Sequence, residues 1–225
     1  MKASKEEWQK EVRKIFDKMY RHEEDYTIQS NGNELKIKPN VFSPAYFSDS
    51  QWFADNLTEI VEQKKLLEIG TGTGIIALAC RMNGADVTAT DINECAVENA
   101  KINLPKDVKI LLGDMYEPVE GKFDYIFWNH PFNKGDNPNE KILLKAGFDY
   151  KYESLEKYIS QASEYLLDDG KLLLGTGNFA DIDEIKRIAK ENSYSLELLR
   201  KTECPLEHGG DMINEFMIYN IKKLE

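Results

Sequence analysis

The sequence predicts an α/β protein with a mostly parallel β-sheet, helices on both faces and an antiparallel pair of strands at or near one edge. From Lys65 onward, short apolar runs alternate with amphipathic stretches, and glycines or acidic residues separate them. Such alternation is typical of parallel strands joined by crossover helices. Residues 194–221 contain two β-prone runs with no helix between them, and strands joined in this way pair antiparallel.

The first 45 residues predict a helix followed by a β-hairpin. Between Lys5 and about His22, apolar residues recur at helical spacing, with charged residues between them. Asn31-Gly32 lies between two β-prone runs, which is a strong hairpin signal. We therefore expect an N-terminal extension, residues 1–45, and a main domain, residues 46–225. The apolar side of the helix must be buried, so it docks on the main domain, covers a pocket as a lid or forms a dimer contact; docking is the simplest of these.

The main domain is predicted to alternate regularly between strands and helices. The expected strands are 65–69, 86–91, 108–112, 123–129 and 171–176. The expected helices are 74–83, 94–103, 153–167 and 181–192.

Composition and charge exclude several classes of protein. With 225 residues, 41% hydrophobic and 31% charged, the chain has the composition of a soluble globular protein. The net charge of -11 disfavours a protein that holds a nucleic-acid backbone by itself, because that affinity comes mostly from Lys and Arg. No stretch predicts a signal peptide or a membrane span, so we expect a cytoplasmic protein without a membrane partner. The oligomeric state stays open. Cys80, Cys95 and Cys204 are scattered, which argues against a disulfide framework and against a metal site.

Polar residues end four successive predicted strands, where α/β sheets bind their ligands. Glu68 precedes a glycine loop with Gly70, Gly72 and Gly74; the spacing is not that of a dinucleotide fingerprint, which needs a glycine at Ile75. The next strand ends on Asp91, whose carboxylate suits ribose hydroxyls. The third strand ends on Asp114 and the fourth on Asn129. Four such residues in succession predict a nucleoside-binding site.

These residues resemble the motifs of class I S-adenosylmethionine-dependent methyltransferases, over about residues 42–221. The matching segments are E-I-G-T-G-T-G (68–74), D-I (91–92), G-D-M (113–115) and N-H-P-F (129–132). The resemblance implies a Rossmann-like, seven-stranded sheet whose last strand is antiparallel, with S-adenosylmethionine as cofactor. It implies that Glu68 holds the methionine part, Asp91 the ribose, and Asp114 with Met115 the adenine. The implied cofactor-binding residues are Phe47, Glu68, Gly70, Thr71, Gly72, Gly74, Asp91, Ile92, Asp114, Met115 and Asn129.

The segment N-H-P-F resembles the (D/N/S)-x-P-(Y/F/W) motif of methyltransferases that act on adenine or cytosine amino groups and on release-factor glutamine. The implied catalytic residues are Asn129, His130, Pro131 and Phe132. The Asn129 side-chain oxygen and the His130 carbonyl oxygen are expected to accept the two N–H groups of the acceptor. Phe132 stacks on its planar group, and Pro131 stiffens the turn. The His130 side chain is more simply a histidine oriented by its backbone than a general base.

Three neighbouring segments are further candidates for the walls of the site. Tyr46, Phe47 and Trp52 lead into a helix before the glycine loop, and they either pack or close over the cofactor. Residues 133–154 read as a long polar connection in which Phe148, Tyr150 and Tyr152 face the pocket. His208, Gly209 and Gly210 occupy the last hairpin turn, as a plain turn or as a flexible loop on the substrate side.

We therefore expect an S-adenosylmethionine-dependent N-methyltransferase that acts on a planar amide or amino nitrogen of a small molecule or of a protein glutamine. One alternative is an adenine amino methyltransferase acting on RNA or DNA, which the net charge disfavours. Another is a cofactor-binding module that has lost catalysis. A nicotinamide-dependent oxidoreductase is disfavoured because acidic strand ends repel a pyrophosphate and because the third glycine is misplaced.

Overall fold

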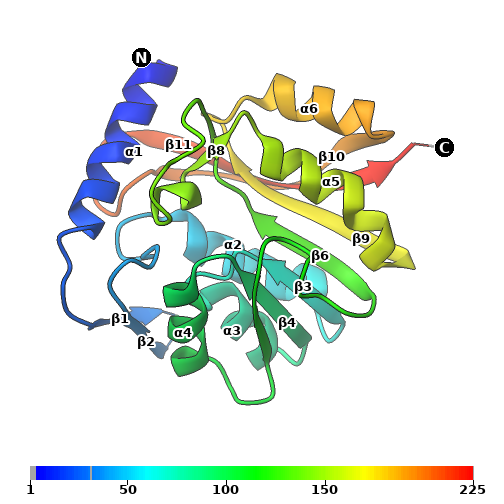
Figure 1. The fold of residues 1–225 in the computed structure, drawn as a ribbon, viewed down its shortest axis with the longest axis horizontal. Helices are drawn as coiled ribbons and strands as arrows, with labels where there is room; N and C mark the ends of the chain where they lie inside the picture. The colour runs from blue at the N-terminus through cyan, green and yellow to red at the C-terminus, as the bar shows by residue number, and fades with distance from the viewer. Residues whose placement is uncertain (1–3, 31, 225) are drawn as a thin grey trace.

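A seven-stranded sheet forms the centre of the molecule (Figure 1). The computed structural model describes residues 4–30 and 32–224. The strand order is β10-β11-β9-β6-β3-β4-β5, and β11 runs antiparallel to both of its neighbours while the remaining pairs are parallel. This is the predicted fold. The strands are β3 (Lys65–Ile69), β4 (Asp86–Asp91), β5 (Lys109–Leu112), β6 (Phe123–Asn129), β9 (Leu166–Gly177), β10 (Tyr194–Pro205) and β11 (Ile213–Lys223).

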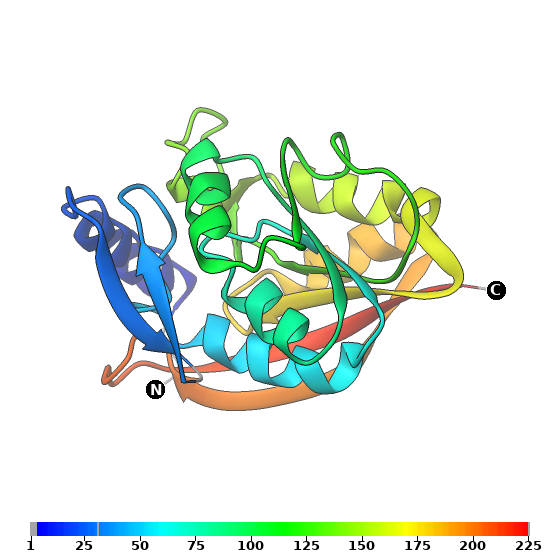
Figure 2. The ribbon, with the colours of Figure 1, turned by 90° about the horizontal axis from the view of Figure 1, so that it is seen from below.

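Helices cover both faces of the sheet. Figure 2 shows α2 and α3 together on one face and α5 and α6 together on the other. These helices are α2 (Asp49–Val61), α3 (Ile75–Met82), α4 (Glu94–Asn103), α5 (Glu153–Tyr165) and α6 (Ile182–Glu191). Each buries one apolar side against the sheet, which is why the sequence shows helical periodicity there. None of the helices in the described part of the chain is both long and apolar enough to cross a membrane.

The N-terminal extension contains α1 (Lys5–Met19) and a hairpin of β1 (Tyr26–Ser30) and β2 (Asn33–Ile37). The helix begins with a capping box between Ser4 and Glu7 and ends three residues before the predicted end. Its apolar side is buried in the same core as the sheet, so the helix docks on the main domain. The predicted turn residue Asn31 lies outside the described residues, and the division of the chain at residue 45 stays a prediction.

The hairpin is fixed to α4 by side-chain amides. The Asn99 oxygen accepts the Lys38 N–H at 2.7 Å, and the Asn99 nitrogen donates to the Lys36 carbonyl oxygen at 2.6 Å. The Asn103 oxygen accepts the Lys36 N–H at 2.9 Å, and the Asn103 nitrogen donates to the Lys36 carbonyl oxygen at 2.8 Å. The extension is therefore joined to the main domain at two places, through α1 and through β2.

The connection after β6 differs from the predicted polar loop. It forms a small parallel sheet of β7 (Asn133–Gly135) and β8 (Phe148–Tyr150), with a 3₁₀ turn, Leu144–Ala146, between them. Strands of three residues are too short to show an alternating pattern, so the sequence did not reveal them. The strand predicted at 171–176 also begins earlier, at Leu166, where it continues directly from α5.

Candidate functional site

A cavity of about 360 Å³ opens at the carboxyl ends of β3, β4 and β6. Most of the predicted site residues line it, including the glycine loop, the strand-end acids and the whole N-H-P-F segment. The predicted residues that line it are Phe47, Glu68, Gly70, Thr71, Gly72, Asp91, Ile92, Asp114, Met115, Asn129, His130, Pro131 and Phe132. The motifs therefore meet in one place, as ligand sites at the switch point of such sheets do.

Four predicted candidates between residues 46 and 152 do not line the cavity. Gly74 is the N-cap of α3, and a Cβ there would lie 3.0 Å from the Leu104 side chain, so this glycine permits close packing against Leu104. Tyr46 and Trp52 pack beside the cavity without lining it, and only Phe47 of that aromatic group reaches it. Tyr152 is fully buried behind it.

The glycine loop turns around the Asp91 carboxylate. Gly72 has a φ of 57°, a conformation that favours glycine, and its N–H donates to Asp91 Oδ2 at 2.9 Å. The Asn93 N–H donates to the other Asp91 oxygen at 2.8 Å. A Cβ on Gly70 would lie 3.1 Å from the Trp128 ring nitrogen, so only glycine passes this ring easily. The backbone thus holds the carboxylate at the floor of the cavity.

Glu68 and Asp91 are buried carboxyls without a basic partner among the described residues. Burial raises the pKa of Glu68 to about 8, opposed by the hydrogen bond from the Thr71 hydroxyl and assisted by the charge of Asp91. Burial also raises the pKa of Asp91, opposed by the N–H groups of Asn93 and Gly72. Two buried acids that lack a cation fit a ligand that carries positive charge.

Asp114 is paired with a basic side chain. Its carboxylate forms an ion pair of 2.7 Å with Lys157 of α5. The neighbouring Met115 is buried and has a φ of 55°. At the strand end where the adenine contact is predicted, a lysine therefore neutralises the acid, and the backbone of the next residue is strained.

The Asn129 side chain is oriented by Asp49, a residue that the sequence analysis missed. Asn129 Nδ2 donates at 2.9 Å to Oδ2 of Asp49, the first residue of α2. Asn129 Oδ1 is buried and accepts no hydrogen bond from any described residue. Asp49 is itself buried, which raises its pKa. An acid at the first position of a helix is expected from the helix dipole alone, so nothing in the sequence indicates this contact.

His130 is enclosed and uncharged. It is 2% exposed, and its Nε2 lies 2.9 Å from the Thr176 hydroxyl of β9. Burial lowers the pKa of His130 to about 3. A histidine with such a pKa is neutral at physiological pH and is a poor proton acceptor, which supports the oriented, non-catalytic interpretation of its side chain.

The Phe132 ring forms an aromatic wall with rings from two other strand ends. Its centroid lies 5.3 Å from that of Phe179 and 6.2 Å from that of Phe216. Phe132, Phe179 and Phe216 all line the cavity. The wall suits a flat acceptor group placed against an aromatic face.

Helix α1 completes the cavity from above, through Val12 and Phe16. Arg13 of the same helix pairs with Glu140 at 2.8 Å, and its guanidinium lies 4.1 Å from the centroid of the Phe148 ring. Trp8 stacks on Phe179 with the centroids 4.7 Å apart. The helix is therefore packed on the main domain, and two of its side chains line the cavity.

Loops from two other places border the same end of the cavity. Phe148 and Tyr150 of β8 line it as predicted, and Leu206 reaches it from the loop between β10 and β11. His208 of that loop lies 3.2 Å from the Pro44 carbonyl oxygen and, like Gly209 and Gly210, does not line the cavity. The last loop therefore packs against residues 44–48 and contributes one apolar side chain.

Acidic side chains dominate the cavity. Lys145 is the one basic side chain among the described residues that line it. The acidic ones are Asp49, Glu68, Asp91, Asp114, Glu140, Asp149 and Glu153. This charge suits cationic and neutral ligands and disfavours phosphates.

Comparisons with known proteins agree on one family. The model of the methyltransferase small domain family matches residues 32–201. A Methanocaldococcus jannaschii protein with the provisional name protein N5-glutamine methyltransferase is 32% identical over 207 residues, covering 88% of this chain and 99% of the relative. The release factor glutamine methyltransferase of Aliivibrio fischeri is 30% identical and covers 71% of this chain and 62% of the relative.

Enzymes that act on ribosomal RNA are also similar. The ribosomal RNA small subunit methyltransferase C of Photobacterium profundum is 26% identical and covers 88% of this chain. The chain spans about half the length of that enzyme, 52%. Among solved structures, the E. cuniculi Mtq2–Trm112 complex, responsible for methylation of the eRF1 translation termination factor, has a TM-score of 0.60 at 19% identity, covering 82% of this chain and 99% of that one. These structural likenesses establish the fold.

Proposed function

Because this chain belongs to the methyltransferase small domain family, we propose that it methylates the side-chain amide nitrogen of a glutamine in a protein, with S-adenosylmethionine as the methyl donor. The observation that carries the proposal is the Asn129 amide, whose nitrogen is held by Asp49 and whose oxygen is buried without a donor among the described residues. A buried acceptor of this kind is costly unless a donor reaches it. An amide NH₂ group supplies such a donor.

The floor of the cavity fits the cofactor. S-adenosylmethionine, when bound, supplies a methyl group that a sulfonium charge makes electrophilic. Glu68 and Asp91 are the buried acids that suit a ligand with a cationic amino group and a ribose. Thr71 and Gly72 hold those carboxylates in place through their hydrogen bonds of 2.7 and 2.9 Å. These residues bind and orient, and they take no part in bond making.

At the other end, the N-H-P-F segment orients the acceptor. The lone pair of an amide nitrogen is delocalised into its carbonyl, so the nitrogen is a weak nucleophile that needs accurate placement. Asn129 Oδ1 and the His130 carbonyl oxygen are the acceptors that would take its two N–H groups, and Phe132 gives the flat group a face to lie on. The nitrogen loses a proton after transfer, and the His130 side chain does not take it, since the pKa of that side chain is about 3.

Three features favour a protein glutamine over RNA. The relative at 32% identity is named for protein glutamine, whereas a ribosomal RNA enzyme of Haemophilus influenzae reaches 30%. The match covers 99% of the archaeal relative but only 52% of the ribosomal RNA enzyme. The cavity is lined mostly by acids, which repel a phosphate backbone.

The test combines a binding and a transfer measurement. Calorimetric titration with S-adenosylmethionine and S-adenosylhomocysteine reports the cofactor site. Tritium transfer from the labelled cofactor is then followed into release-factor and ribosomal protein fractions, free glutamine and bulk RNA. We expect label in protein, lost when the acceptor glutamine is replaced by glutamate and lost with Asn129→Ala. Label in RNA or in free glutamine instead would reject a protein acceptor, and no binding of either cofactor form would reject the function.

A further inference from the structure

Tyr152 lies directly behind the N-H-P-F segment, between β8 and α5. Its side chain is fully buried and does not line the cavity. It has a φ of 60°, and the preceding Lys151 has a φ of 51°. A bulky residue in this left-handed conformation is unusual, and such a residue persists only where its surroundings hold it firmly.

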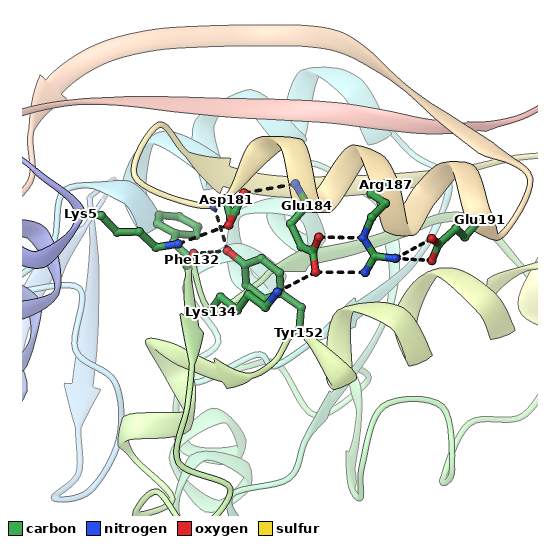
Figure 3. A network of polar contacts seen from close by, with 8 residues as sticks. All are labelled: Lys5, Phe132, Lys134, Tyr152, Asp181, Glu184, Arg187 and Glu191. Carbon is green, nitrogen blue, oxygen red and sulfur yellow. Dashed lines mark hydrogen bonds and ion pairs between the residues drawn. The ribbon is translucent and has the colours of Figure 1, made fainter.

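The Tyr152 hydroxyl connects the motif to α6. It donates to the Phe132 carbonyl oxygen at 2.6 Å and accepts the Asp181 N–H at 3.1 Å (Figure 3). The Tyr152 ring also meets the His130 ring edge-on, with the centroids 5.8 Å apart. One side chain thus touches two of the four motif residues, from the side that faces away from the cavity.

The Asp181 N–H that binds this hydroxyl belongs to a network of charged side chains. Asp181 caps α6 by accepting the Glu184 N–H at 3.2 Å, and it pairs with Lys5 of α1 at 3.4 Å. Glu184 in turn binds Lys134 of β7 at 2.6 Å and Arg187 at 2.8 Å (Figure 3). The Asp181 N–H that holds Tyr152 is therefore fixed by contacts with α1, β7 and α6 together.

We propose that Tyr152 is a positioning residue for methyl transfer: its hydroxyl fixes the Phe132 carbonyl and thereby the turn from which Asn129, His130 and Phe132 meet the acceptor. This inference rests on the proposed function. Without the hydroxyl, the Phe132 peptide loses its one side-chain anchor in the described residues and turns more freely, and the acceptor nitrogen is aimed less well. The cofactor floor, on β3 and β4, does not contact Tyr152.

The test is Tyr152→Phe, which keeps the ring and removes the hydroxyl. Tyr158→Phe is the matched control, since Tyr158 is also a buried tyrosine whose hydroxyl donates to backbone oxygens, of Leu173 at 2.7 Å and of Ile126 at 3.3 Å. Both variants lose a buried hydrogen bond, so both are expected to unfold at a lower temperature. We expect Tyr152→Phe alone to lower kcat, by roughly tenfold to a hundredfold, with the Kd for S-adenosylmethionine within about twofold of wild type.

A second control distinguishes the effect of the Tyr152 hydroxyl from that of the Asp181 side chain. Asp181→Ala removes the helix cap and the ion pair with Lys5 but keeps the backbone N–H that binds Tyr152. Because the Asp181 side chain acts on that N–H only indirectly, we expect the variant to lower stability and to lower kcat less than Tyr152→Phe does, in assays run well below the melting temperature. A kcat of Tyr152→Phe equal to that of wild type or of Tyr158→Phe would overturn the positioning role while leaving the proposed function intact. Absence of transfer by the wild-type protein would overturn both.

Discussion

At the scale of single residues, the Asp49–Asn129 contact decides which atom of the Asn129 carboxamide stays free to accept a hydrogen bond. An asparagine amide can turn by half a rotation and exchange its oxygen with its nitrogen. An ionised Asp49 carboxylate accepts only, so it binds the nitrogen end and leaves Oδ1 for a donor. The acceptor property of Asn129 is therefore set by a residue 80 positions earlier in the chain.

We predict that Asp49→Asn lowers kcat and leaves cofactor affinity unchanged. The new side chain can donate as well as accept, so Asn129 is no longer held in one orientation. A hydrogen bond to a charged group contributes about 1.5–3 kcal/mol, which corresponds to a loss of roughly tenfold to a hundredfold in rate. Steady-state kinetics with calorimetry measures both quantities. The matched control is Asp124→Asn, because the Asp124 carboxylate accepts the Lys65 N–H at 2.9 Å at the opposite end of β6. Equal losses of kcat in both variants would contradict the prediction.

Glu68 gives a pH dependence whose sign follows from its raised pKa. The pKa is about 8 in the folded protein and 4.5 for an ordinary glutamate. Between these values the folded protein holds a proton that the unfolded chain has released, so the free energy of unfolding falls as pH rises through this window. This stabilising contribution is complete below pH 4.5 and lost by about pH 8.

We predict that Glu68→Gln, which carries no charge, weakens this decline in the ligand-free protein. The variant should become more stable than wild type near pH 8, by at least about 1.4 kcal/mol, the equivalent of one pKa unit. Asp91 and Asp49 also have raised pKa values, so part of the decline remains. Denaturant unfolding at both ends of the window measures the difference, and parallel curves for the two proteins would refute the assignment. Cofactor affinity is expected to fall in the same variant.

The sequence revealed the residues at the strand ends because each one closes an apolar run. It did not reveal Asp49, and it predicted Tyr152 to face the pocket, because both act through contacts that are distant in the chain and lie in segments of ordinary local pattern. Asp49 starts a helix, where an acid is expected in any case. Tyr152 stands in a stretch rich in aromatic residues, and nothing local indicates that its hydroxyl binds Phe132.

At the scale of elements, α1 makes a tight contact with the loop before β8, where Phe16 lines the cavity. A Cβ on Gly147 would lie 2.6 Å from Phe16 Cε2, and Phe16 is 1% exposed. An added methyl group at position 147 would therefore force the phenyl ring to move. The small residue at position 147 is therefore what allows α1 to lie over the cavity.

We predict that Gly147→Ala destabilises the protein by about 1–3 kcal/mol, the usual range for an overpacked core, and loosens α1. Denaturant unfolding gives the stability, and amide hydrogen exchange of residues 5–19 reports the helix. Gly135→Ala is the control in the paired strand β7, because the nearest atom to its Cβ, the Asp149 carbonyl oxygen, lies at an ordinary 3.4 Å. If both alanines lowered stability equally, the steric contact with Phe16 would not be the cause.

The alternation of strands and helices predicted most elements with their approximate bounds. It missed the small sheet of β7 and β8, because strands of three residues contain too few positions for a pattern. The docking of α1 was predictable from its apolar side, but its contribution of Val12 and Phe16 to the cavity was not. Which surface a helix covers depends on the tertiary fold, and periodicity reports only that one side must be covered.

At the scale of the whole molecule, the net charge of -11 bears on whether the acceptor is RNA or protein, because the two differ in how their binding depends on salt. Binding to RNA releases counterions, so RNA affinity falls by roughly a thousandfold or more between about 50 and about 200 mM salt. A protein acceptor that enters through an aromatic wall and two hydrogen bonds has no comparable dependence. We predict that the KM for the protein acceptor changes by less than about tenfold over this range. A steep rise in KM would favour the ribosomal RNA relatives as guides to function.

The reversed strand β11 affects how the enzyme is assembled during synthesis. It follows every other strand in the chain, yet it is inserted between β10 and β9, and its residue Phe216 pairs with Gly177 and lines the cavity. A nascent chain on the ribosome therefore carries all the cofactor motifs before the acceptor wall exists. Until residues 213–223 leave the exit tunnel, β9 and β10 each keep an open edge that can pair with another chain. We infer that the emerging enzyme is catalytically incomplete, and most prone to aggregate, until residues 213–223 pair with β9 and β10.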